Sequence, residues 1–230
     1  MPDRNLAFTQ ILSESLPSKV TRALKEAFFA GTLRAGDVIV ERRLAKEMGV
    51  GTPAIREALV TLEEQGFIRR VANTGTYVNK FNPEEVEQMF LVRTEFEVLA
   101  FQWAKRRVDG RQLGALESLV EKMEAAAAQK NTRQFYEYDL EFHRRCWALC
   151  GNKYLCRALE AILAPLFACV LNESRDAVQV PIAREHYNLI NALRRLEEPE
   201  FTAAVRRSLT VFALRGMKSI VHNSAKGETA

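Results

Sequence analysis

The sequence predicts a mostly α-helical protein with an N-terminal winged helix-turn-helix and a C-terminal all-helical bundle. Three observations support this prediction. The first part of the chain shows short helical patterns that end at glycines, and β-type runs occur only over 67–71 and 76–79. After Asn82, apolar residues recur at helical spacing over long stretches. We therefore expect two domains, over residues 1–80 and 81–230.

The composition sets limits on the classes of protein that this chain can be. With 230 residues, 47% of them hydrophobic, it can bury a core, and a net charge of +4 is too small for a polybasic tail. The longest apolar stretch, 161–171, is far short of the roughly 20 residues that span a bilayer. The N-terminus lacks the apolar run of a signal peptide. We expect a cytoplasmic protein with no membrane partner.

The cysteines do not form a recognisable metal or disulfide motif. All four lie in one stretch without a CxxC pair: Cys146, Cys150, Cys156 and Cys169. This spacing suits neither a disulfide framework nor a zinc finger. We expect reduced thiols.

The first predicted helix and the hairpin lie at the two ends of the N-terminal domain. Apolar residues at helical spacing follow Pro17, and Gly31 stands where a C-terminal cap belongs. The β-type runs flank Asn73-Thr74-Gly75, a sequence typical of a hairpin tip. This hairpin would form the wing.

Between them, two closely spaced helices predict a helix-turn-helix. A short helix over 41–48 is closed by Gly49. Thr52 is a good N-cap for the next helix, Pro53 a good first helical residue, and Gly66 would end it. About three residues would separate the two helices.

The C-terminal domain opens on a strong helix start, because Asn82 can cap and Pro83 suits the first turn. Pro165 is expected to kink the helix that contains it. We expect no strand in this domain. The predicted helices span about 83–107, 111–129, 132–149, 153–172, 181–197 and 200–221.

The second helix of such a motif usually enters the major groove of DNA. Arg56 lies on the polar side of this helix and can read guanine with its planar guanidinium. Arg42 and Arg43, at the start of the preceding helix, can contact bases or phosphates. On spacing alone an ordinary solvated surface is an equal alternative, since short helix-turn-helix patterns also occur in proteins that do not bind DNA.

Residues 17–80 resemble the N-terminal domain of the GntR family of bacterial transcription regulators. The matching pieces include Glu41-Arg42-Arg43-Leu44-Ala45, Ile55-Arg56-Glu57-Ala58-Leu59 and Asn73-Thr74-Gly75 with Val78. The resemblance implies a homodimer that binds double-stranded palindromic operator DNA. The DNA-binding residues would be Arg42, Arg43, Thr52, Arg56 and Gly75. Many relatives have Ser-Arg where this chain has Gly51-Thr52, so its operator should differ at the base that arginine reads.

Two pairs of polar residues stand out in the second domain. Asp139 and His143 are four residues apart on one predicted helix face and could share a metal ion, but a satisfied buried pair is the favoured alternative from spacing alone. Cys146 continues this face and reads as a small core residue, or less readily as a thiolate ligand. Arg93 and Glu97 could form an exposed ion pair of little energetic weight.

The chain after residue 82 resembles the FCD domain, the all-helical ligand-binding domain of the FadR subgroup of GntR regulators. The resemblance rests on Arg93, Glu97, Asp139, His143, Gly151-Asn152 and Glu185-His186. It implies a divalent transition metal, zinc or nickel, on Asp139, His143 and His186, and a small carboxylate effector held by Arg93. Ser208 stands where the family's last histidine ligand is expected, so the effector site would comprise Arg93, Asp139, His143, His186 and Ser208.

These observations predict a sequence-specific transcription regulator that is controlled by a small organic acid. The family resemblance favours a repressor. Two other classes of protein fit the sequence less well. A metal-dependent enzyme could use Asp139, His143 and His186, but the sequence has no H-E-x-x-H, GxSxG or phosphate-loop motif. A helical scaffold that binds only protein would leave Arg56 and the wing unexplained. We expect no enzymatic activity.

Overall fold

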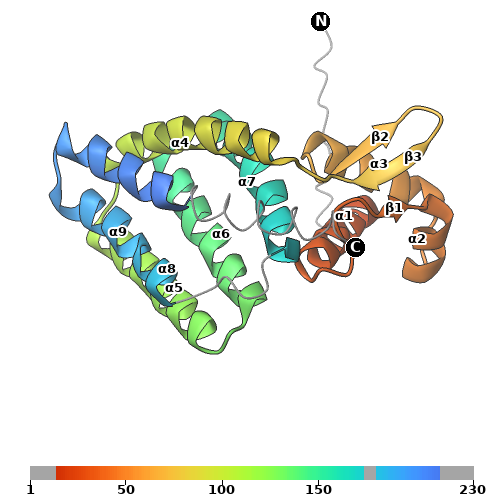
Figure 1. Cartoon of the computed structure of the whole chain (residues 1–230), viewed down its shortest axis with the longest axis horizontal. Coiled ribbons are helices and arrows are strands. Elements are labelled where there is room, and N and C mark those ends of the chain that lie inside the picture. The colour runs from red at the N-terminus through yellow and green to blue at the C-terminus, as the bar shows by residue number, and fades with distance from the viewer. Residues whose placement is uncertain (1–13, 174–179, 213–230) are drawn as a thin grey trace, which may run out of the picture.

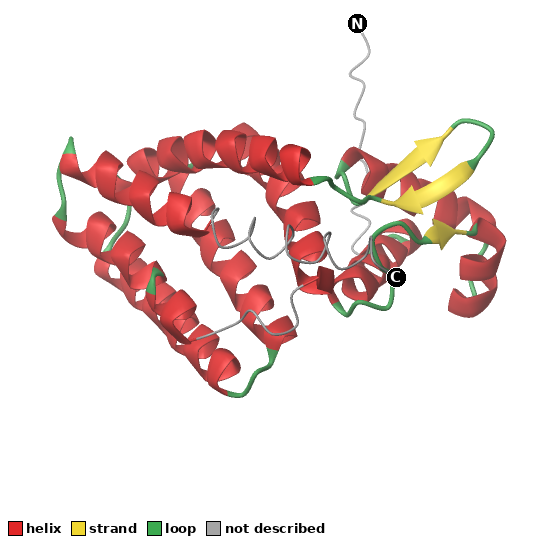
Figure 2. Ribbon diagram, viewed as in Figure 1, coloured by secondary structure: helices red, strands yellow, loops and turns green. Residues whose placement is uncertain are grey.

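The computed structural model describes residues 14–173 and 180–212, which form two lobes (Figure 1). The smaller lobe holds α1 to α3 and a small sheet. The larger lobe is purely helical in the part of the chain described (Figure 2). The mostly helical class predicted from the sequence is confirmed.

The N-terminal lobe contains the predicted helix-turn-helix and wing. Its sheet has the order β1-β3-β2 with antiparallel pairing. The strand β1 was not predicted; it has only two residues, and its pairing of Val38 with Tyr77 crosses a long stretch of sequence. The elements are α1 Leu16–Phe29, β1 Val38–Ile39, α2 Glu41–Met48, α3 Thr52–Glu64, β2 Ile68–Val71 and β3 Gly75–Val78.

The apolar faces of α1 and α3 form the core of this lobe. Leu24, Ile55 and Leu59 are fully buried, and the ring of Phe28 stacks on that of Phe67 at 5.3 Å. The predicted N-cap of α3 is wrong by one residue, because Gly51 occupies the cap position and the helix begins at Thr52. A glycine cap has no side chain that could accept a backbone N–H.

The C-terminal lobe follows the predicted helix order with one difference. The helix expected over 181–197 is two helices, α8 and α9, separated at Glu185. The helix α7 continues through Pro165, and the expected end of the last helix at 221 lies outside the described residues. The elements are α4 Pro83–Lys105, α5 Gly110–Ala128, α6 Thr132–Cys150, α7 Lys153–Glu173, α8 Val180–Arg184, α9 His186–Arg195 and a helix over 200–212.

The helix α6 runs through the middle of this lobe, with α4, α5 and α7 packed around it (Figure 1). Its Phe142, Cys146 and Trp147 side chains are buried in one apolar cluster. Cys146, Cys150 and Cys156 are free thiols, as predicted, and the side chain of Cys169 lies outside the described part. No helix in the described ranges combines the length and hydropathy needed to cross a bilayer.

The two lobes meet where α7 touches the turn after α3. Gly66 has a φ of +75°, and a Cβ added there would lie 3.3 Å from Cγ of Pro165. Ala164 is buried in the apolar core of the N-terminal lobe. Beside this contact, burial lowers the pKa of Lys25 on α1, and the Glu160 carboxylate, which pairs with Arg144, partly opposes that shift.

This contact predicts that Gly66→Ala destabilises the protein by about 1–3 kcal/mol, since alanine disfavours the left-handed conformation and its methyl would press on Pro165. Urea unfolding followed by circular dichroism would measure the change. Gly114→Ala is the matched control, because Gly114 lies inside α5 with open space around it and should gain up to about 1 kcal/mol. Equal effects of the two substitutions would contradict the prediction.

Candidate functional site

The helix-turn-helix presents α3 beside α2 with three residues between them. Gly49 ends α2 in a left-handed conformation, with a φ of +65°, and lets the chain turn at once into α3. Ala45 on α2 and Ile55 on α3 are buried in the same core. Their packing sets the angle between α2 and α3.

Arg56 lies on the exposed side of α3, as the sequence predicts, and its side chain is 67% exposed. Its Nε donates a hydrogen bond of 2.7 Å to Oε2 of Glu41, at the start of α2. The contact holds the guanidinium over the surface of the two helices. Because Nε makes this bond, the two terminal nitrogens can still form a bidentate contact with a base.

The other predicted DNA-binding residues lie on α2, at the start of α3 and in the wing. Arg42 and Arg43 are exposed on α2, where Arg43 pairs with Glu47 at 2.7 Å. Gly75 begins β3 at the exposed tip of the hairpin, and Thr52, partly buried, opens α3.

Two further arginines of the wing were not predicted from the sequence. Arg69 and Arg70 are exposed on β2, which pairs with β3. Arg70 contacts Glu63, and Arg69 lies 5.9 Å from the centre of the Tyr77 ring. Their position beside the predicted hairpin tip was the available signal.

The C-terminal lobe buries six polar residues, and five of them, all except Ser208, contact one another in a second candidate site. The exposed fraction of each is 6% or less. They come from α4, α6, α9 and the helix over 200–212. The residues are Arg93, Glu97, Asp139, His143, His186 and Ser208.

Arg93 and Glu97 form a buried ion pair, with Nε donating to Oε1 at 2.9 Å. Their alternative interpretation as an exposed pair is wrong, because Arg93 is 4% exposed and Glu97 is fully buried. His143 joins them: its Nδ1 lies 3.1 Å from Oε2 of Glu97, and its Nε2 lies 3.3 Å from Nη2 of Arg93. Burial alone would raise the pKa of Glu97, but the charges of Arg93 and His143 lower it to about 2.

Asp139 connects this group to α9. Its Oδ1 lies 2.6 Å from Nε2 of His186 and 3.8 Å from Nε2 of His143. The His186 Nδ1–H donates to the carbonyl of Ala183 at 3.0 Å, which leaves Nε2 facing the carboxylate. Burial would raise the pKa of Asp139, but the charges of His186, His143 and Arg93 and the hydrogen bond from His186 together lower it.

Three of these residues have the geometry and chemistry of metal ligands. One ligand atom each from Asp139, His143 and His186 lies within 4.8 Å of the others, and all three residues are buried. Imidazoles that bind a metal are neutral, so in the metal-bound cluster two carboxylates would face a single guanidinium, and the cation would neutralise the remaining negative charge. Nε2 of His186 is buried and faces Oδ1 of Asp139 at 2.6 Å, so two donor atoms of the group already lie side by side. The donor set therefore fits a divalent metal.

Ser208 and Cys146 are also buried in the C-terminal lobe but do not belong to the three-residue group. Burial and the charge of Glu97 raise the pKa of the Cys146 thiol well above its usual value. A protonated thiol is a poor metal ligand, so Cys146 acts as a small core residue.

Glu97 is part of the family resemblance but was not predicted from the sequence as a residue of the site. A signal was available, because Arg93 and Glu97 continue the apolar stripe that runs through Phe90, Ala100 and Phe101 on α4. Charged residues on a buried stripe are rare unless they are paired.

The comparisons with known families match both lobes. Residues 16–78 match the model described as bacterial regulatory proteins, gntR family. Residues 88–210 match the FCD domain.

Individual relatives agree with these matches. The chain is 27% identical to an uncharacterized HTH-type transcriptional regulator, YdhC of Bacillus subtilis, over 75% of this chain and 78% of that protein. It is 23% identical to the HTH-type transcriptional repressor RspR of Escherichia coli, over 86% of each chain. Among solved structures, E. coli McbR/YncC superposes with a TM-score of 0.78 at 19% identity, over 91% of this chain and 99% of the other.

The buried ion pair predicts a large cost when its anion is removed. Glu97→Gln would leave Arg93 buried without its counterion, and we expect a loss of about 3–5 kcal/mol in the free energy of unfolding. Glu137→Gln is the control, because Glu137 pairs with Arg133 on the exposed side of α6 and should cost less than about 1 kcal/mol. A similar, small loss for both variants in urea unfolding would show that Arg93 does not need Glu97.

Proposed function

The chain belongs to the GntR family of bacterial regulatory proteins and carries an FCD domain, and from this we propose which residues bind DNA and which bind the effector. It is a DNA-binding transcription regulator. The family and the relatives are regulators, so the alternative of a metal-dependent enzyme has no support. We assign DNA binding to residues 1–80 and effector binding and dimerisation to residues 81–230.

The exposed face of α3 supports the proposal for DNA. Arg56, held by Glu41, would read a base in the major groove, while Arg42 and Arg43 would contact bases or phosphates from α2. Thr52 and the Gly75 wing would hold the backbone. GntR regulators typically act as dimers, and a twofold homodimer would read a palindromic operator with equal half-sites.

The buried cluster supports the proposal for the effector. Asp139, His143 and His186 would hold a zinc or nickel ion, which when bound would supply positive charge to an anionic ligand. Arg93 would contact the carboxylate of a small organic acid, with Glu97 keeping its guanidinium oriented. Ser208 would donate or accept a hydrogen bond in place of the imidazole that it replaces.

The contact between the lobes supports a route from effector to DNA. Arg144 follows His143 on α6 and pairs with Glu160 on α7, beside Lys25 of the DNA-binding lobe. A shift of α6 on effector binding would therefore move a contact of the N-terminal lobe. Linkage requires that operator DNA alters effector affinity by the same factor as effector alters DNA affinity. We propose that the protein is a repressor, as the relative RspR is named. We further propose that it acts in the cytoplasm.

The DNA proposal predicts that Arg56→Ala weakens specific operator binding by about 1–3 kcal/mol, because a bidentate base contact is lost. The operator would first be selected from a random DNA library, and binding would be measured by fluorescence anisotropy at fixed salt, since affinity depends on salt. Arg133→Ala removes an exposed, ion-paired arginine from α6 and should leave affinity unchanged. An Arg56→Ala protein with unchanged affinity would remove Arg56 from the interface.

The effector proposal predicts about one zinc or nickel per chain in protein purified without a histidine tag. Elemental analysis before and after a chelator would measure it. Asp139→Asn should lose most of the metal, because it removes the only carboxylate of the three-residue group, while Glu137→Gln on the same helix should keep it. If neither metal were found and neither raised the melting temperature, the site would be purely organic.

A further inference from the structure

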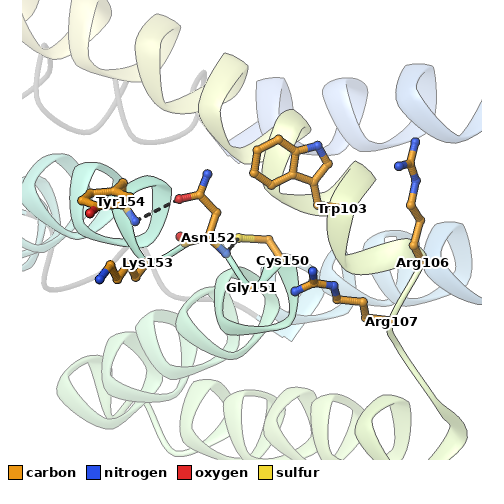
Figure 3. A pocket seen from close by; sticks show the side chains of 8 residues that line it. All are labelled: Trp103, Arg106, Arg107, Cys150, Gly151, Asn152, Lys153 and Tyr154. Carbon is orange, nitrogen blue, oxygen red and sulfur yellow. Dashed lines mark hydrogen bonds between the residues drawn. The ribbon is translucent and has the colours of Figure 1, made fainter.

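A cavity lies away from the buried cluster, between the end of α4 and the turn from α6 to α7 (Figure 3). Its volume is about 560 Å³, within the range of small-molecule sites. Neither Arg93 nor the three metal-ligand candidates line it. The lining residues are Trp103, Arg106, Arg107, Cys150, Gly151, Asn152, Lys153 and Tyr154.

The charge of this cavity is entirely positive. Arg106, Arg107 and Lys153 line it, and the lining includes no carboxylate. None of these three cations forms an ion pair with a carboxylate in residues 14–173 or 180–212. Three cations around one hollow repel one another, so an anion bound there would be stabilised by all of them.

Arg107, which is exposed like Arg106 and Lys153, lies directly over the turn at Gly151. Gly151 has a φ of +69°, and a Cβ added to it would lie 1.4 Å from Nη1 of Arg107. Any larger residue would therefore displace the guanidinium. Asn152 holds the same turn, since its Oδ1 accepts the backbone N–H of Tyr154 at 3.0 Å and of Leu155 at 3.2 Å.

Two aromatic rings complete the cavity. Trp103 extends from α4 and Tyr154 from the first turn of α7, on different sides of the hollow (Figure 3). Tyr154 is 69% exposed and Trp103 is partly buried, so both have ring surface that a ligand can cover. Stacking on such rings stabilises planar groups, including nucleobases.

We propose that this cavity binds a small molecule that joins a planar ring to a phosphate, of the nucleoside monophosphate class. Three cations suit a dianionic phosphate better than a single carboxylate, and the aromatic rings suit the base. The site goes beyond the effector function assigned to the buried cluster. The two are joined by α6, on which Trp147 lies between Cys150 at the cavity and His143, its ring centre 6.2 Å from that of His143.

Trp103 supplies a direct test on the full-length protein. The chain has two tryptophans, and Trp147 is 1% exposed in the core, so a ligand in the cavity should change mainly the fluorescence of Trp103. Adenosine 5′-monophosphate should give a saturable change, adenosine none, and ribose 5-phosphate a weaker one. Trp103→Phe should remove the signal. No saturable change at millimolar nucleotide would overturn the proposal, and equal binding of ribose 5-phosphate would overturn the aromatic part of it.

Variants separate a specific site from general charge attraction. Arg106→Ala and Lys153→Gln should each weaken nucleotide binding about 10-fold or more, because each removes one charged contact. Arg195→Ala removes an exposed cation from α9, outside the cavity, and should change nothing. Arg107 is left intact because it packs on Gly151, and circular dichroism would verify the fold of each variant. Equal affinities of Arg106→Ala, Lys153→Gln and Arg195→Ala would overturn the proposal.

Discussion

The C-terminal lobe depends on one buried ion pair, between Arg93 and Glu97 on α4. A guanidinium in an apolar interior is costly unless its charge and its hydrogen-bond donors are matched. Glu97 matches the charge, and His143 on α6 contacts both partners. Asp139 then links the cluster to His186 on α9. The relative positions of three helices are therefore set by directional polar contacts, which tolerate less sliding than apolar packing alone.

The sequence was informative wherever local chemistry decides structure. Glycine after a short helix, a cap before Pro83 and apolar spacing located the helices of both lobes within a few residues. The strand β1 could not be predicted, because a two-residue strand exists only through its pairing with β3. The break at Glu185 was missed for a related reason: the apolar pattern continues across it, while the hydrogen bond from His186 to Ala183 forms only in the folded turn.

The candidate sites show the same limit. The spacing of Asp139 and His143 places them on one face, but only the family resemblance pointed to His186, which the fold brings to them from α9. The apolar stripe of α4 indicates that Arg93 and Glu97 are buried, but it does not show that His143 of α6 is the residue packed against them. The basic cavity joins residues 103–107 to residues 150–154, which have no motif in common.

The contact between Gly66 and Pro165 also has a consequence for protein engineering. Regulators with two such lobes look modular, as if the DNA-binding lobe could be exchanged while the C-terminal lobe is retained. Here the core of the DNA-binding lobe includes Ala164, a residue of α7 in the C-terminal lobe. A chimera joined in the linker before Pro83 would therefore pack the DNA-binding lobe of another protein against a surface of α7 that fits Gly66. To change the DNA-binding specificity in this way, the residues of α7 that face the DNA-binding lobe must be exchanged together with that lobe.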